Sequence, residues 1–307
     1  MDGILQALAG LFLGTTADPS AVESCSLPLQ QVVLTSSIDG SEQPSCAYLV
    51  EDQTALLVNL HPWSSDLYWV EDDILAFARH MGMSYIVPNA RGPSDHPDAC
   101  GSDVTVADID DVISAYRDKA PVIVIGHSGG GFHALNQFLR GAELADFYSV
   151  WVPITDLGQW HKETKNRGLR YAEEIEKCTG LDPEELAHRS PISHVDKAID
   201  RKTHVHISSG IFDGHDGRQV PISHAIRFYN QLAAAWGIDD LVEGKAFGDL
   251  LTLAVDWDDD EDFATIATFG GERLTLQIFE GGHQIRPDIA IKDVEHFVFE
   301  HQLEHQH

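Results

Sequence analysis

The sequence predicts an α/β fold in which a mostly parallel central sheet is flanked by helices. Two observations carry this prediction: short apolar runs recur along the chain, and segments with apolar residues at helical spacing separate them. Continuous apolar runs are typical of parallel strands that are buried on both faces. The expected strands are 54–61, 84–90, 121–126, 147–154, 203–210 and 274–281. The expected helices are 66–81, 103–117, 129–140, 223–237 and 287–303.

The 307 residues are expected to form a single domain, because the chain has neither an internal repeat nor a low-complexity linker. Residues 30–50 read as a hairpin that turns at Asp39-Gly40 and precedes the alternating strands and helices. Three segments break the alternation. They are an N-terminal extension (1–27), a polar, helix-prone insertion expected as a cap above the sheet (155–200) and an acidic insertion, also above the sheet (239–270).

The charge of the chain excludes several kinds of partner. Forty-nine acidic residues face 20 basic ones, which gives a formal net charge of −29. A protein this negative repels phosphate backbones and anionic lipids, so neither nucleic acid nor an anionic membrane surface is expected as a partner. The charge favours solubility in salty surroundings, where screening removes self-repulsion. We expect a salt-tolerant protein with an acidic surface.

The cysteines and the N-terminus bear on the compartment. The four cysteines fit no zinc or C-x-x-C spacing, so buried free thiols or two disulfides in any of three pairings remain open; they are Cys25, Cys46, Cys100 and Cys178. The N-terminus lacks the basic region of a signal peptide, and Asp2 has the wrong charge. No apolar stretch is long enough to span a bilayer. The sequence leaves the compartment and the oligomeric state open and slightly favours the cytoplasm.

A nucleophile is predicted at Ser128. The residues Gly126-His127-Ser128-Gly129-Gly130 fit the pattern G-x-S-x-G, with an apolar strand directly before them and an amphipathic helix directly after. This strand-turn-helix context is typical of a nucleophile elbow, in which a tight turn exposes the serine hydroxyl. Glycine-rich turns of this kind also bind phosphate, but neither a P-loop lysine nor a G-x-G-x-x-G spacing is present.

The base is predicted at His283. A serine nucleophile needs a base, and in an elbow fold the order along the chain is serine, acid, histidine. His283 follows the last expected strand and comes after Gly281-Gly282, which let the chain turn back over the sheet edge. The other histidines near the C-terminus lie on or beyond the final helix.

The acid is expected just after the strand that ends at Gly210. Both Asp213 and Asp216 follow it, and either could orient the imidazole. Asp213 is favoured because it lies three residues beyond the strand end, whereas Asp216 is closer to Val220-Pro221. The remaining aspartate is expected to cap the turn.

Two backbone N–H groups are expected to form an oxyanion hole. Gly129 supplies one, and Trp63 the other, because Pro62 has no N–H to donate. The Trp63 indole is interpreted either as a wall of the acyl pocket or as a buried core residue. His127, adjacent to the nucleophile, is expected to contact substrate together with Trp63.

Metal binding is not expected. The acidic run Asp258–Asp262 lacks the EF-hand pattern and is expected to be a solvated loop. Asp213, His215 and Asp216 share one loop, and without a second cluster they make a poor metal site.

With these residues assigned, the chain resembles the α/β-hydrolase superfamily along nearly its whole length. More narrowly, it resembles stand-alone domains related to prolyl oligopeptidases and acyl-carbohydrate esterases. The segments that carry this resemblance are LHPWSSD (60–66), VPNARG (87–92), HPDACGSD (96–103), GHSGGG (126–131), RSPISHV (189–195), GIFDGHDGRQVP (210–221) and EGGHQ (280–284). The resemblance implies a nucleophile at Ser128, a histidine base at His283 and an oxyanion loop at Trp63.

The expected function is hydrolysis of carboxylic esters through an acyl-enzyme, without a cofactor. Small-molecule esters with short acyl groups are favoured because the sequence contains no β-propeller, which gates substrate size in the large oligopeptidases. The alternative is a prolyl-oligopeptidase-like serine peptidase with the same machinery. A binding module without catalysis is a third hypothesis, and a complete candidate machinery argues against it.

Overall fold

The computed structural model describes residues 24–215, 219–255 and 265–304. The strands are β1 Gln30–Thr35, β2 Glu42–Tyr48, β3 Leu56–Leu60, β4 Ser84–Pro88, β5 Val122–His127, β6 Phe147–Trp151, β7 His204–Gly210, β8 Thr265–Gly270 and β9 Leu274–Phe279. The helices are α1 Asp72–His80, α2 Asp103–Tyr116, α3 Gly129–Arg140, α4 Leu157–Asn166, α5 Tyr171–Thr179, α6 Pro183–Arg189, the 3₁₀ helix η1 Pro191–Ala198, α7 Ser223–Ala235, α8 Gly244–Thr252 and α9 Pro287–Glu304.

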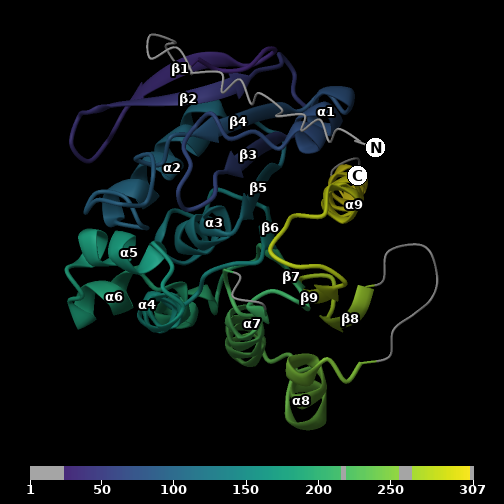
Figure 1. Ribbon diagram of the computed structural model, residues 1–307. Helices are drawn as coiled ribbons and strands as arrows, with labels where there is room; N and C mark the ends of the chain where they lie inside the picture. The colour runs from purple at the N-terminus through teal and green to yellow at the C-terminus, as the bar shows by residue number, and fades with distance from the viewer. Residues whose placement is uncertain (1–23, 216–218, 256–264, 305–307) are drawn as a thin grey trace, which may run out of the picture.

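The strands form one sheet in the order β1-β2-β4-β3-β5-β6-β7-β9-β8. The six strands from β4 to β9 in this order run parallel, whereas β1, β2 and β8 are antiparallel additions at the two edges. The sheet crosses the molecule with helices on both sides (Figure 1). This arrangement confirms the predicted fold class.

The apolar strands divide their side chains between two cores. On β3, Leu56 and Val58 belong to the core that α2, α3 and α7 cover, whereas Leu57 belongs to the core under α1 and α9. On β5, Val124 and Ile125 alternate in the same way. Successive side chains of a strand point to opposite faces, so an uninterrupted apolar run is what a sheet covered on both faces requires.

A third core attaches the first insertion to the sheet. We use the word cap for residues 157–189, which form α4, α5 and α6. Cap residues Leu157, Trp160 and Ile175 pack against Trp63, which follows β3, and against Phe132 of α3. The expected helical excursion in 155–200 is therefore present, and it ends in η1, which packs between α3 and α7.

The second insertion differs from the sequence-based expectation. Residues 239–270 were expected to lie above the sheet, but their last six residues form β8, which pairs with β9 at the sheet edge. Only one face of this edge strand is partly buried, so its sequence, TIATFG, lacks the apolar run that identified the buried strands. The acidic run Asp258–Asp262 lies outside the described residues.

The structure pairs the four cysteines into two disulfides. Cys25 bonds to Cys46 of β2, and Cys100 bonds to Cys178 of α5. The first joins the segment before β1 to the sheet, and the second joins the cap to the loop before α2. The sequence left three pairings open. The fold selects this one because it brings Cys25 close to Cys46 and Cys100 close to Cys178.

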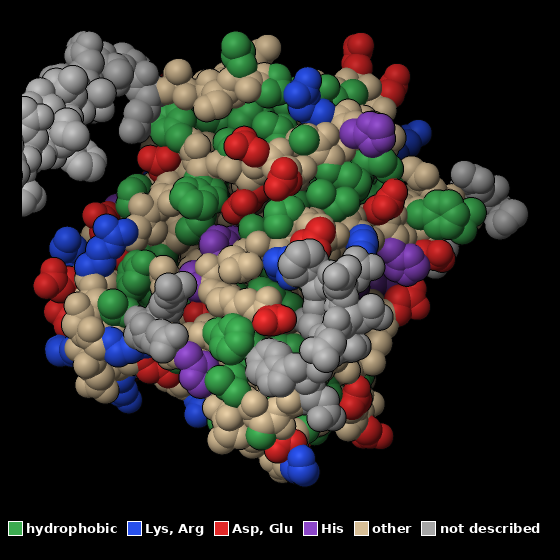
Figure 2. All heavy atoms as spheres, turned by 45° about the vertical axis from the view of Figure 1, so that its right-hand side comes forward, with side chains coloured by type: hydrophobic (Ala, Val, Ile, Leu, Met, Phe, Trp, Pro, Cys, Tyr) green, Lys and Arg blue, Asp and Glu red, His purple; other side chains and the backbone are tan. Residues whose placement is uncertain are grey.

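On the face drawn in Figure 2, acidic side chains are spread over several elements and basic side chains lie among them. In the part of the chain that the structure describes, no helix is long and apolar enough to cross a membrane.

Candidate active site

The turn after β5 places Ser128 at the start of α3. Its backbone adopts φ 60° and ψ −113°, which is unusual for a residue other than glycine, and its N–H donates to Trp151 O at 2.8 Å. This strained turn between a strand and a helix is the geometry expected of a nucleophile elbow. The first turn of α3 begins directly at Ser128, so the positive end of the helix lies beside the hydroxyl.

Two glycines after Ser128 allow a close approach to the loop that follows β3. A Cβ on Gly129 would lie 2.2 Å from Trp63 N, and one on Gly130 would lie 1.9 Å from Leu60 O. Any larger residue at either position would push the helix away from this loop. The glycines of the motif therefore serve the packing of α3 on β3 as well as the turn itself.

The backbones of Gly129 and Trp63, the two predicted oxyanion donors, are in contact. The N–H of Gly129, the first residue of α3, has no partner within its helix. The N–H of Trp63 has no acceptor among the residues that the structure describes. Two unpaired amides on touching backbones beside a serine hydroxyl are suited to a developing negative charge.

His283 joins the serine to a carboxylate. Its Nε2 lies 2.7 Å from Ser128 Oγ, and its Nδ1 lies 2.7 Å from Asp213 Oδ2. The Asp213 side chain is fully buried and that of His283 is 6% exposed. A neutral imidazole that donates from Nδ1 to the carboxylate has its Nε2 lone pair directed at the hydroxyl. The structure thus brings together the three residues that the sequence predicted.

The loop after β7 fixes Asp213 in this position. Gly214 N–H and Val220 N–H donate to Asp213 Oδ1 at 2.9 and 3.2 Å, which leaves Oδ2 for the histidine. The alternative acid, Asp216, lies outside the described residues. In the sequence, the short distance from Asp216 to Val220-Pro221 was the argument for Asp216 as the acid. In the structure, however, the backbone N–H of Val220 donates to Asp213.

His127 lies beside the predicted base. The centroids of the His127 and His283 rings are 5.3 Å apart, and Glu71 Oε1 lies 3.9 Å from His127 Nδ1. Burial, together with the nearby His283, lowers the pKa of His127 to about 3, so its ring is neutral. Burial also raises the pKa of Glu71. No local sequence pattern links Glu71 to His127, because 56 residues separate the two.

The Trp63 side chain occupies the core rather than an open pocket. It is 2% exposed and packs on Phe132 and Trp160, with ring centroids 5.6 and 5.0 Å away. Of the two interpretations of this indole, the structure supports the buried core residue. A wall for the substrate must come from other side chains.

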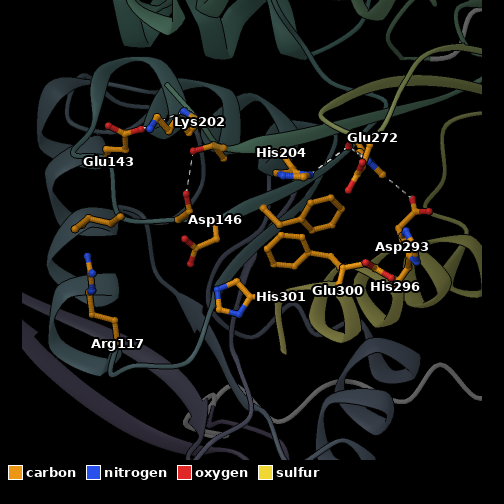
Figure 3. Close-up of a pocket in the computed structure, with 16 residues that line it drawn as sticks. Arg117, Glu143, Asp146, Lys202, His204, Glu272, Asp293, His296, Glu300 and His301 are labelled. Carbon is orange, nitrogen blue, oxygen red and sulfur yellow. Dashed lines mark hydrogen bonds and ion pairs between the residues drawn. The ribbon is translucent and has the colours of Figure 1, made fainter. Parts of the chain in front are cut away.

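A separate cavity of about 590 Å³ lies away from these residues (Figure 3). Phe147 and His204, which line it, begin β6 and β7, whereas Ser128 follows the opposite, carboxyl end of β5. His301 of α9 lies near Asp146 on one side of the cavity, and Glu300 lies farther along, beside His296 (Figure 3). This cavity is therefore too remote to hold a substrate against Ser128.

Metal ligands are not grouped in the described part of the chain. Within residues 24–215, 219–255 and 265–304, no cluster of three or more His, Cys, Asp or Glu side chains could hold a metal ion. The loop that carries Asp213 and His215 therefore presents no metal site in its described residues.

The fold and the site together define a serine hydrolase of the α/β-hydrolase fold. The chain belongs to the prolyl oligopeptidase family, whose model matches residues 69–247. No curated protein matches the chain. The matched segment contains Ser128 and Asp213, while His283 follows it.

Solved structures of similar fold include several peptidases. They are a puromycin hydrolase (TM-score 0.61, 17% identity, 88% of this chain and 38% of that one), an acylaminoacyl peptidase from Pyrococcus horikoshii (TM-score 0.60, 14% identity, 89% and 41%) and prolyl oligopeptidase B from Galerina marginata (TM-score 0.55, 19% identity, 67% and 31%). At these identities the likeness establishes the fold alone. The present chain spans less than half the length of each of these proteins.

Proposed function

We propose that the protein is a serine peptidase that cleaves acyl bonds of peptides or acylated amines through a covalent intermediate on Ser128. The observation that carries the proposal is His283, whose two ring nitrogens lie 2.7 Å from Ser128 Oγ and from Asp213 Oδ2. Membership of the prolyl oligopeptidase family favours peptides over the esters that the sequence favoured. Three similar structures also carry names of peptidases or of a hydrolase of puromycin.

The chemistry follows from the positions of these groups. His283 Nε2 takes the proton of Ser128 as Oγ attacks the carbonyl carbon, and Asp213 stabilises the imidazolium that forms. The N–H groups of Gly129 and Trp63 bind the oxyanion of the tetrahedral intermediate. His283 then gives its proton to the departing amine, and water attacks the acyl-enzyme with His283 again as base.

Hydrolysis of short-acyl carboxylic esters is the second candidate. The same three side chains attack an ester carbonyl, and an alkoxide leaves without the full proton transfer that an amine needs. The geometry of His283 serves either leaving group. The two candidates therefore differ in the substrate that the pocket accepts.

A substrate panel separates the two candidates. Purified protein and its Ser128→Ala variant are assayed with aminoacyl, N-acyl-aminoacyl and prolyl anilides beside p-nitrophenyl acetate and butyrate. Because esters are intrinsically more reactive, each kcat/KM is divided by the spontaneous hydrolysis rate of the same substrate. Saturable, Ser128-dependent anilide cleavage with the larger rate enhancement supports the peptidase. Enhancement confined to the esters supports the esterase, and no Ser128-dependent cleavage of any substrate rejects both.

A further inference from the structure

The cap contacts both loops that carry the predicted machinery. We call residues 61–65, after β3, the oxyanion loop, and the described residues 211–215 and 219–221, after β7, the acid loop. The first contains Trp63 and the second contains Asp213. The two loops follow different strands, and residues from α4 and α5 reach both of them.

On the acid loop, the contact point is Gln219. Trp160 Nε1–H donates to Gln219 O at 2.9 Å, and Tyr171 O–H donates to Gln219 Oε1 at 3.0 Å. Arg167 Nη2 adds a longer bond of 3.4 Å to the same carbonyl. The next residue, Val220, donates its N–H to Asp213 Oδ1. The peptide group between Gln219 and Val220 therefore contacts the cap through its carbonyl oxygen and the predicted acid through its N–H.

On the oxyanion loop, the cap contacts Trp63 and Ser64. The Trp160 ring meets the Trp63 indole edge to face, with an interplanar angle of 74°. Ser64 Oγ–H donates to Glu174 Oε2 of α5 at 3.2 Å. Trp160 is itself stacked on Tyr171, with centroids 5.1 Å apart and planes 27° from parallel. These two aromatic residues are thus in contact with each other, and between them they reach both loops.

We propose that Trp160 and Tyr171 are positioning residues that hold the acid loop and the oxyanion loop in their catalytic arrangement. The inference rests on the proposed serine-hydrolase function. Both residues act through others. Tyr171 holds Gln219, which precedes the residue that binds Asp213. Trp160 packs on the side chain of Trp63, whose backbone N–H is the proposed second oxyanion donor. The disulfide from Cys178 of α5 to Cys100 anchors the cap that carries them.

The burial of these residues agrees with a role in fixing geometry. Trp160 is 1% exposed, and its indole N–H would be left without a partner if Gln219 moved away. Small displacements of catalytic groups have large effects on rate, so a single hydrogen bond between cap and loop is sufficient to matter. The cap is therefore part of the catalytic framework.

The test is a double-mutant cycle between Tyr171→Phe and Gln219→Ala. Both variants remove the same hydrogen bond, and Tyr171→Phe keeps the ring that stacks on Trp160. The primary measurement is the second-order rate at which a fluorophosphonate probe labels Ser128, which does not depend on knowing the natural substrate. The kcat and KM for the best substrate of the panel and the melting temperature are measured on the same preparations.

We expect each single variant to lower the labelling rate and kcat by about three- to tenfold. KM should stay within about twofold, because the substrate contacts are unchanged. The double variant should be no slower than the slower single variant, since both changes break one interaction. The matched control is Glu176→Gln, which removes the negative charge that Glu176 presents to His161 and Lys165 inside the cap and touches neither loop. It should label at the wild-type rate.

Three results would overturn the inference: wild-type labelling in both single variants, losses that multiply in the double variant, or equal losses in Glu176→Gln. The last would mean that any loosening of the cap has the same effect. Failure of the proposed function has a different signature. In that case the probe labels the wild-type protein no faster than it labels Ser128→Ala.

Discussion

His283 Nε2 lies 2.7 Å from Ser128 Oγ, although 155 residues separate the two along the chain. The parallel sheet makes this contact possible, because the chain leaves β5 and β9 at the same end of the sheet, the end formed by the carboxyl termini of the parallel strands. β6 and β7 separate these two strands in the sheet, and the Gly281-Gly282 turn lets the imidazole reach back across them. The catalytic hypothesis depends on this distance.

Replacing Ser128 with alanine should abolish hydrolysis and leave the fold intact. Loss of a triad member typically lowers kcat by about 10⁴- to 10⁶-fold. The measurement is turnover of the best substrate by wild type and Ser128→Ala, with circular dichroism as the control for folding. Full activity in the purified variant would end the serine-hydrolase interpretation.

Asp213→Asn should be far slower than Asp216→Asn. Asp213 Oδ2 is 2.7 Å from His283 Nδ1, so an amide in its place favours the wrong tautomer of the imidazole, at a cost of about 10⁴ in kcat. Asp216 follows the same strand and is the matched control. If Asp216→Asn is the crippled enzyme, the acid is misassigned, although the mechanism stands.

The protein should lose stability as pH falls below about 6.5, in part through His133. Burial, together with the neighbouring His61, lowers the pKa of His133 from 6.5 to about 3, and its side chain is 1% exposed. Between these two values the unfolded chain binds the proton and the folded chain does not. The contribution of this histidine to the free energy of unfolding is therefore complete above pH 6.5. Below pH 6.5 it falls by about 1.4 kcal/mol per pH unit.

Urea denaturation at pH 7 and pH 5 measures this effect. His133→Gln removes the titrating group, so its free energy of unfolding should decline less between the two pH values than that of wild type. His80→Gln, at an exposed position near the end of α1, is the control and should decline as wild type does. Equal declines in all three proteins would show that His133 is not responsible.

Sodium chloride should raise the melting temperature from its value at low salt. The net charge of −29 destabilises the compact state through self-repulsion, and the Debye length shrinks to about 3 Å at 1 M salt. Melting curves between 10 mM and 2 M sodium chloride measure the effect. Sodium sulfate at matched ionic strength is compared separately, since it also strengthens apolar burial. A flat or falling curve in sodium chloride would count against this expectation.

Features that depend on short stretches of the chain could be predicted from the amino-acid sequence. The apolar runs identified the six parallel strands, because burial on both faces favours apolar side chains at most positions. The motif around Ser128 predicted the turn, since glycine is the residue that allows a strained strand-to-helix junction and a close approach to β3. Chain order then selected His283. The strand β8 was not predicted, because an edge strand with one exposed face has no continuous run of apolar residues.

Contacts between residues far apart in the chain depend on the three-dimensional packing. It placed Asp213 against His283, paired Cys100 with Cys178, and brought Trp160 and Tyr171 of the cap to Gln219. These contacts join residues from 48 to 78 positions apart, and no local pattern encodes them. They follow from the packing of the whole sheet and its insertions, in which each loop takes the position that buries its apolar side chains and satisfies its polar groups.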